Sequence, residues 1–215
     1  MLCKMQSFET NIFINCPFDK EYVNDMLKPM LFFIIQKGLN PRLSLEVSDS
    51  GQFRLEKIIN IIKECKYSIH DLSKIKATSV DEYARMNMPF ELGVDFGIKS
   101  MNDEILSKKQ FLILEAVKYD YMKALSDING MDIKVHKNET ETLFECLYSW
   151  ISETIKKMGQ SPPIKSLYDY SDFNKRLFNN KLKEYKSIMI TNNYIEKVSI
   201  PEYIQVVKTY VNEMF

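Results

Sequence analysis

Two carboxylates in this chain stand where they could cleave a glycosidic bond. Glu91 lies in the sequence NMPFELG, which has the pattern of a helix start, and Asp71 lies in the apolar run YSIHDL, which has the pattern of a strand. In an open parallel sheet, the carboxyl end of a strand and the start of the next helix open onto one ligand crevice. A pair of acids in such a crevice is the arrangement that glycosidases use.

Glu91 is the first candidate for a catalytic residue. We expect it in the first turn of its helix, where the helix N-terminus favours the ionised form of a carboxylate. An ionised carboxylate that faces a sugar can attack the anomeric carbon or stabilise an oxocarbenium-like transition state. The alternative is an acid that only stabilises the helix start.

Asp71 is the second candidate, because doubly wound folds bind their ligands at the carboxyl ends of strands. The alternative is a turn-forming aspartate that caps its own loop. His70 precedes it, so the two side chains should point to opposite faces of the sheet. We interpret His70 as a packed histidine.

The loop NCPFD after the first strand supplies several groups that could bind a nucleotide. Asn15 could orient a ribose, Pro17 makes the turn rigid, and Phe18 could stack on a base. Alternatively, Asp19 is the N-cap of the next helix and Phe18 is its hydrophobic staple. Cys16 has no histidine in position to activate it, so it is predicted to be a buried structural thiol.

Four further positions could contact a phosphorylated substrate. Arg54 follows Gly51 near a helix start, where phosphate can bind, although a surface ion pair with Glu56 or Glu46 is the alternative. Asn87 either binds ligand or caps its helix, and Arg85 lies nearby. No glycine pattern matches a dinucleotide-binding or P-loop fingerprint, which argues against a hydride-carrying NAD cofactor and against a kinase or ATPase. We expect no bound cofactor, with NAD or a nucleotide as substrate.

Alternating strand and helix patterns predict the fold that positions these groups. Strands are expected at 11–16, 42–47, 67–72, 110–115 and 132–136, and helices at 19–37, 53–64, 89–99 and 139–157. This alternation predicts an α/β fold with a parallel sheet covered on both faces. We expect a flavodoxin-like, doubly wound sheet of about five strands in the order 2-1-3-4-5. Pro29 is expected to kink or break the first helix.

A second region follows this predicted α/β domain. The segment GQSPP at 159–163 marks a boundary, which divides the chain into a domain at 1–158 and a helical C-terminal extension at 159–215. Helices are expected at 172–185 and 202–214, and the segment between them is left unassigned. Loops are expected at 48–51 and 74–85, the second as a mobile cover over the site. The extension should pack on the core or build a homo-oligomer.

Composition limits the partners of the chain. The 29 basic and 29 acidic residues cancel, which gives no reason to expect nucleic acid or an anionic membrane. Four scattered cysteines and no signal peptide predict a reducing, cytoplasmic location. The longest apolar run is too short to span a bilayer. Two histidines far apart do not predict a zinc site, so no metal is expected.

Three motifs in order, NCPFD, HDLS and NMPFELG, resemble those of nucleoside 2-deoxyribosyltransferase-like and TIR-like proteins over roughly residues 10 to 155. The resemblance implies a flavodoxin-like core, with Glu91 as the catalytic glutamate and Asp71 holding the sugar or base. The transferases carry an acid six residues before this glutamate, where this chain has Arg85. An arginine suits a phosphorylated substrate such as NAD better than a free deoxynucleoside.

The resemblance supports three hypotheses. The first is an N-glycosidase that hydrolyses or cyclises NAD or a related nucleotide, as TIR-like NADases of bacterial antiphage defence do. The second is a nucleoside or nucleotide 2-deoxyribosyltransferase or hydrolase with Glu91 as covalent nucleophile. The third is a catalytically silent sensor that binds a nucleotide. An effector or activator protein is a further expected partner.

Overall fold

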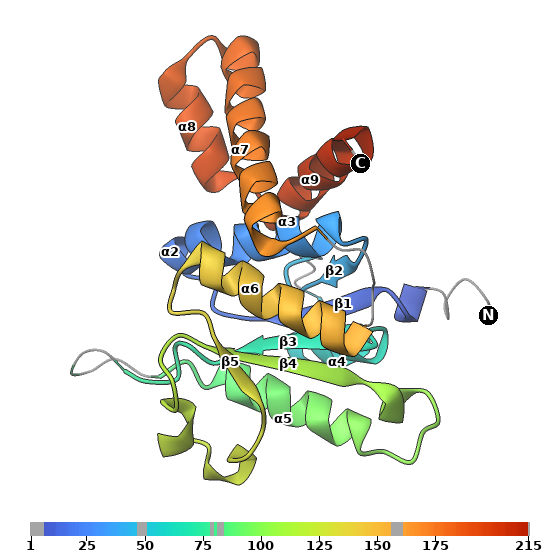
Figure 1. The fold of residues 1–215 in the computed structure, drawn as a ribbon. Coiled ribbons are helices and arrows are strands. Elements are labelled where there is room, and N and C mark those ends of the chain that lie inside the picture. Colours follow the sequence, from blue (N-terminus) through green and yellow to red (C-terminus); the bar gives the residue numbers. More distant parts are fainter. Residues whose placement is uncertain (1–6, 47–50, 78–79, 81–83, 156–160, 215) are drawn as a thin grey trace.

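A computed structural model describes residues 7–46, 51–77, 80, 84–155 and 161–214 of the chain. Five parallel strands form one sheet in the order β2-β1-β3-β4-β5 (Figure 1). The strands are β1 (Asn11–Asn15), β2 (Asn40–Arg42), β3 (Tyr67–Asp71), β4 (Gln110–Glu115) and β5 (Ile133–Val135). The predicted flavodoxin-like fold class and its strand order are confirmed.

Helices cover both faces of the sheet. Helices α4 (Arg54–Lys63) and α5 (Asn87–Lys99) lie on one face, and α3 (Lys28–Gln36) and α6 (Thr140–Trp150) lie on the other (Figure 1). Short helical turns are η2 (Leu106–Lys108), η3 (Tyr121–Lys123), η4 (Ser126–Ile128) and η5 (Ile151–Ile155). Every residue of β1 and β3 is buried, so neither strand alternates between buried and exposed residues, and their polar side chains are buried as well.

The alternation of side chains along β1 divides the core between the two faces. Phe13 packs with Ile58 and Ile62 of α4, whereas Ile12 and Ile14 belong to the large cluster on the side of α3 and α6. This large cluster also contains buried side chains from the C-terminal helices. The C-terminal extension therefore shares a core with the α/β region.

The second strand is displaced from its predicted position. The alternating sequence at 42–47 predicted a strand, but β2 pairs with β1 through Asn40, Pro41 and Arg42. Pro41 is tolerated there because β2 is an edge strand. The residues that follow form a turn in which Arg42 Nε donates to both carboxylate oxygens of Glu46 at 2.9 Å. Val47, the last predicted residue, lies outside the described residues.

The first predicted helix changes its hydrogen-bond pattern ahead of Pro29. The helix begins as α2 (Lys20–Tyr22), continues as the π-helical turn η1 (Val23–Leu27), and becomes α3. The N–H of Lys28 donates to the carbonyl of Val23, five residues back. Because proline has no N–H to donate, the wider turn before it accommodates the predicted irregularity without ending the helix.

The C-terminal extension forms three helices: α7 (Pro163–Tyr185), α8 (Ile188–Lys197) and α9 (Ile200–Met214). Helix α7 begins nine residues before its predicted start, with Pro163 at its first position. Helix α8 was not predicted; Ser187 caps it after Lys186 adopts a left-handed backbone with φ 52°. The predicted boundary at 159–163 lies partly outside the described residues.

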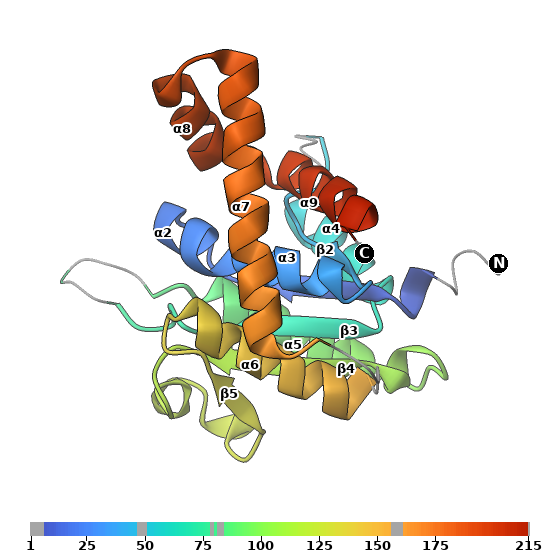
Figure 2. The ribbon, with the colours of Figure 1, turned by 45° about the horizontal axis from the view of Figure 1, so that its top comes forward.

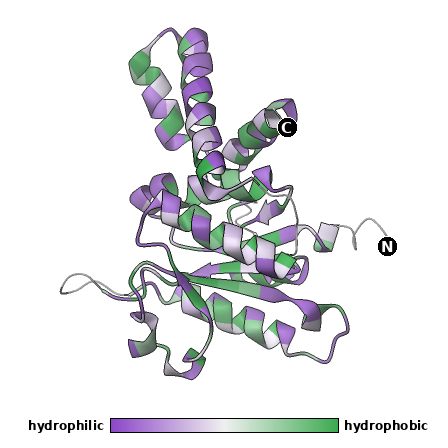
Figure 3. Ribbon diagram, viewed as in Figure 1, coloured by the Kyte–Doolittle hydropathy of each residue, from purple (hydrophilic) through white to green (hydrophobic). Residues whose placement is uncertain are grey.

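Helices α7 and α8 form a hairpin that projects from the α/β region, and α9 lies beside α3 and β2 (Figures 1 and 2). Lys208 of α9 donates to Asn40 Oδ1 at 2.9 Å. Hydrophilic residues predominate along α7 (Figure 3), and its buried side chains are confined to its first two-thirds. None of the helices in the described part of the chain is long and apolar enough to cross a membrane.

Candidate functional site

The residues of the predicted site gather at the carboxyl edge of the sheet. Asn15 ends β1, Asp71 ends β3, and Glu91 lies on α5, whose start is at the same edge (Figure 1). Burial raises the pKa of the Cys16 thiol well above its usual range, and the negative charges of Asp71, Glu91 and Asp19 raise it further. The three acids therefore lie close enough to act on Cys16, which is buried as predicted.

Glu91 is buried and electrostatically unlike its prediction. Helix α5 begins at Asn87, two residues earlier than predicted, so Glu91 lies in the second turn, beyond the N–H groups that would hold it ionised. Its side chain is only 8% exposed. Burial raises its pKa to about 7, and the positive charge of Arg54 opposes that rise only in part. Among the described residues, no hydrogen bond or ion pair satisfies its carboxylate.

Asp71, in contrast, is fully buried and fully satisfied. Its carboxylate accepts hydrogen bonds from Tyr22 Oη at 2.5 Å, from the Ser73 N–H at 2.9 Å and from Ser73 Oγ. His136 Nε2 lies 2.9 Å from the same group. Burial alone would raise the pKa of Asp71, but these donors together lower it. With no exposed surface, Asp71 holds Tyr22, Ser73 and His136 in place, and its catalytic role stays a prediction.

His136 has a defined tautomer but does not form a hydrolytic triad. Its Nδ1 accepts the Asn138 N–H at 3.0 Å, so Nε2 carries the proton and donates to Asp71. Ser73 Oγ is 3.0 Å from the same Nε2. A serine–histidine–aspartate triad needs serine and aspartate on opposite ring nitrogens. Here both lie at Nε2, which excludes serine-type nucleophilic catalysis by this cluster.

A second buried chain of polar groups holds the start of α5. Asn15 Nδ2 donates to the Met88 carbonyl at 2.8 Å and to His70 Nδ1 at 3.0 Å. His70 Nε2 then donates to Asp95 at 3.1 Å. His70 and Asp71 have separate partners, which agrees with the prediction that they face opposite sides and that His70 is packed. Asn15 is therefore a positioning residue for the helix that carries Glu91.

The loop after β1 follows its structural alternative. Asp19 caps α2 by accepting the Tyr22 N–H at 3.1 Å, and it lies 3.9 Å from Lys74 Nζ. Phe18 is half-buried against the large core cluster, as a hydrophobic staple would be. Pro17 is buried. The predicted stacking of Phe18 on a base stays a prediction.

The residues predicted to bind phosphate lie at the surface. Arg54 is exposed, its Nη2 is 3.3 Å from Ser44 Oγ, and Glu46 pairs with Arg42 instead. Gly51 is exposed, but the rest of the predicted loop 48–51 lies outside the described residues. Arg85 is exposed, and its N–H donates to the Lys74 carbonyl at 2.9 Å. Asn87 is exposed and is the first residue of α5 but not its cap, so the capping alternative is wrong.

The predicted cover over the site at 74–85 is described only in part, because 78–79 and 81–83 lie outside the described residues. The bond from Arg85 to Lys74 joins the two ends of this segment at the carboxyl edge. Arg54 and Arg85 are thus the two exposed cations named by the prediction, and only Arg54 acts electrostatically on Glu91.

Sequence reasoning missed three residues of the site: Tyr22, Asp95 and His136. His136 follows β5, and the rule that selected Asp71 at the end of β3 selects this position as well. Asp95 is four residues after Glu91, so both lie on one face of α5. A charged residue on a buried face is rare unless it is paired, which was a usable signal. Nothing in the local sequence marks Tyr22.

The described residues contain no group of three or more histidine, cysteine or carboxylate side chains able to hold a metal ion. The chemistry available at this edge is that of one buried acid, Glu91, an adjacent exposed cation, Arg54, and rigid polar supports. In these surroundings, the carboxyl group of Glu91 can stabilise a developing positive charge, donate a proton, or act as nucleophile. No protein-family model, curated protein or solved structure that was compared matches this chain.

Proposed function

We propose that this protein is an N-glycosidase acting on NAD or a related nucleotide, in which Glu91 stabilises the ribosyl cation. The observation that carries the proposal is a buried carboxyl at the carboxyl edge, with no hydrogen-bonding partner among the described residues and a pKa of about 7. A structural acid at this depth would be paired, as Asp71 and Asp95 are. A buried carboxylate without a partner is complementary to a positive charge that the ligand brings into the site.

The positive charge of the nicotinamide ring in NAD matches this requirement. Its nicotinamide ring is a cation bonded to the ribose C1′, and the leaving base becomes neutral while positive charge develops on the ribose. The nicotinamide cation of the bound substrate favours the ionised carboxylate, so substrate binding lowers the pKa of Glu91. The ionised carboxylate then stabilises the ribosyl cation that develops in the transition state. The C1′–N bond breaks with its electron pair going to the base, and water adds to C1′ with release of a proton.

The neighbours of Glu91 support this assignment. Asn15 holds the Met88 carbonyl three residues before Glu91, which fixes the first turn of α5. Arg54, exposed and electrostatically coupled to Glu91, is available for a substrate phosphate. The resemblance to TIR-like NADases agrees with the same reaction and supports a role in bacterial antiphage defence.

One observation favours a second candidate function. With a pKa of about 7, Glu91 is half protonated at neutral pH and could donate a proton to a neutral purine or pyrimidine. That chemistry suits a nucleoside or nucleotide 2-deoxyribosyltransferase or hydrolase. If Glu91 were its nucleophile, a slow 2-fluoro substrate should leave a glycosyl-enzyme that intact-mass spectrometry detects.

The dependence of rate on pH separates cleavage of NAD by ionised Glu91 from acid catalysis by Glu91 on a neutral nucleoside. A nucleophilic Glu91 would also need to be ionised, so the glycosyl-enzyme is the test of that case. For NAD, the free enzyme needs ionised Glu91, so kcat/KM should rise about tenfold per pH unit below about 7 and level off above it. For a neutral nucleoside with Glu91 as general acid, kcat/KM should instead fall as pH rises above about 7. A profile that is flat from pH 5.5 to 8.5 would remove Glu91 from both mechanisms.

The direct test is a chromatographic assay of base release from NAD, NADP, nucleosides and nucleotides. The wild type, Glu91→Gln and a control, Glu145→Gln at an exposed position of α6, would be compared. Base release by the wild type and the control, but not by Glu91→Gln, is the expected result. Nucleotide binding by titration without any turnover would favour the silent sensor instead.

Homo-oligomerisation through the C-terminal extension belongs to the same proposal. Ile188 and Met189, at the tip of the α7–α8 hairpin, are 62% and 78% exposed, which supports a contact with a second copy or with an activator protein. A fall in specific activity on dilution, together with a concentration-dependent mass by light scattering, would be expected if the assembly completes the site.

A further inference from the structure

A cavity of about 400 Å³ lies at the carboxyl edge beside the end of β4, away from the groups described above. This volume is within the range of small-molecule sites. Its lining residues come from the end of β4, the segment after it and the start of β5: Glu115, Lys118, Tyr119, Tyr121, Met122, Gly130, Met131, Asp132 and Ile133. The proposed mechanism uses none of them.

Tyr119 is held in this cavity by an unusual backbone. Its φ is 68°, in the left-handed region that a bulky residue rarely adopts. Buried Glu115 maintains this conformation, because its two carboxylate oxygens accept the Tyr119 N–H at 2.6 Å and the Tyr121 N–H at 3.3 Å. The Tyr119 side chain remains 54% exposed. A buried carboxylate thus fixes the backbone that places an exposed aromatic ring in the cavity.

The groups around the Tyr119 ring are those that recognise a nucleotide. An exposed aromatic face can stack on a base of any identity. Lys118 Nζ lies 4.8 Å from the centre of the ring, where it could pair with a phosphate. Asp132, which is exposed and also lines the cavity, could accept hydrogen bonds from the hydroxyls of a ribose. Met122 and Met131 supply apolar surface.

The cavity is connected to the helix that carries Glu91. Tyr121, which is 2% exposed, packs in one cluster with Met88 and Leu92 of α5. β4 is the neighbour of β3, and β5 is the next strand along, so the cavity lies about 5 to 10 Å along the sheet edge from the end of β3. A dinucleotide joined through a pyrophosphate is long enough to span this distance.

We propose that this cavity binds the nucleoside 5′-monophosphate half of a dinucleotide, distal to the bond that is cleaved, with Tyr119 stacked on the base. The inference rests on the proposed function, because the cleaved half is placed at Glu91. It selects dinucleotides such as NAD as the substrate class in preference to mononucleotides.

The first experiment is calorimetric titration of adenosine 5′-monophosphate into four full-length proteins. Tyr119→Asn removes the ring while asparagine tolerates positive φ, and Tyr119→Phe keeps the stacking surface. The control, Tyr168→Ala, removes a tyrosine of α7 that is 71% exposed and also has a lysine over its ring, at 5.7 Å. Tyr119→Asn should weaken binding about 10- to 100-fold, whereas Tyr119→Phe and the control should bind like the wild type. Equal affinity in all four proteins, or no binding to the wild type, would overturn the assignment.

The second experiment compares base release from NAD and from nicotinamide mononucleotide. Tyr119→Asn should lower kcat/KM for NAD about 10-fold or more and leave that for the mononucleotide unchanged. An equal loss on both substrates would overturn the distal subsite. If no substrate is turned over but Tyr119→Asn still loses the monophosphate, the proposed function fails and the nucleotide site stands. If NAD is turned over equally by Tyr119→Asn, the function stands and the subsite fails.

Discussion

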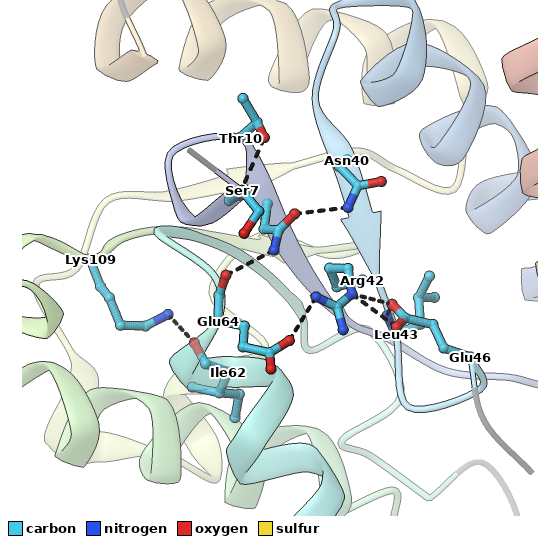
Figure 4. A network of polar contacts seen from close by, with 10 residues as sticks. Ser7, Thr10, Asn40, Arg42, Leu43, Glu46, Ile62, Glu64 and Lys109 are labelled. Atoms are coloured by element: carbon cyan, nitrogen blue, oxygen red, sulfur yellow. Dashed lines mark hydrogen bonds and ion pairs between the residues drawn. The ribbon is translucent and has the colours of Figure 1, made fainter. Parts of the chain in front are cut away.

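The two edges of the central sheet differ in whether their polar and charged side chains have partners. At the amino edge, the polar groups satisfy one another: Asn11 Nδ2 donates to the Glu64 carbonyl at 2.9 Å, and Asn40 Nδ2 donates to Asn11 Oδ1 at 2.8 Å (Figure 4). Arg42, the last residue of β2, reaches this edge through Glu64 and also pairs with Glu46. At the carboxyl edge, Glu91 is only 8% exposed but has no such partner among the described residues.

The difference shows which edge serves stability and which is available for chemistry. Lys109, 1% exposed at the start of β4, donates to the carbonyls of Ile62 and Cys65 at 2.9 and 2.5 Å and lies 3.3 Å from Asp95. A buried charge with such partners is inert. Glu91 has a pKa of about 7, so its charge changes near neutrality and responds to a ligand. Perturbed acids of this kind are typical of functional sites.

The largest expected effect is on turnover, and it tests whether the carboxyl edge is the catalytic one. Glu91→Gln keeps the size of the side chain and removes its charge, so base release from NAD should fall about 1,000-fold, the usual cost of losing a transition-state electrostatic contact. Single-turnover kinetics at saturating NAD would measure it. Circular dichroism should show an unchanged fold. Full activity of the variant would show that Glu91 has no catalytic role and, like the amino-edge residues, is only structural.

A variant at the amino edge should act on stability instead. Lys109→Met leaves Asp95 without its buried cation and should lower the free energy of unfolding by about 3 to 5 kcal/mol. Urea denaturation would measure this. The control is Lys66→Met, whose partner Glu9 at 2.6 Å is exposed, and it should cost no more than about 1 kcal/mol. An equal loss of stability in the two variants would show that the buried pair of Lys109 and Asp95 contributes no more than an exposed ion pair.

The pH dependence of stability tests the state of Glu91. Its pKa of about 7 in the folded protein is above the ordinary 4.5, so between these values the unfolded chain releases a proton that the folded protein keeps. Stability therefore falls as pH rises through this window, by up to about 3 kcal/mol. Glu91→Gln should match the wild type near pH 4 and exceed it at pH 8 by that amount. Thermal denaturation at both pH values would measure it, and a stability difference that does not change with pH would contradict the raised pKa.

The smallest effect concerns the rim of the amino edge. Arg42 makes a two-point contact with Glu46 and a further contact with Glu64, and the side chain is 21% exposed. Arg42→Lys retains the charge but loses the planar geometry, so stability should fall by about 1 kcal/mol with no change in turnover. A loss of activity larger than the loss of stability would show that the two edges are coupled.

Much of the fold was predictable from local patterns. β1, β3 and β4 lie within one residue of their predicted ranges because their apolar, β-branched runs satisfy a strand buried on both faces. The strand order follows because short right-handed crossovers leave few alternatives. The edge strand β2 was misplaced, since three residues that include Pro41 carry little pattern of their own, and pairing with β1 decides their position.

The amino-acid sequence by itself determined that Glu91, Asp71 and Asn15 belong to one edge of a parallel sheet, because chain order and strand direction determine which ends of the elements meet. Only the tertiary structure decided their electrostatic roles. Asp71 lost its exposed surface to Tyr22 and His136, and Asn15 became a support for α5, whereas Glu91 was buried without a partner among the described residues. Desolvation and hydrogen bonding depend on neighbours that are distant in sequence, and no local pattern records them.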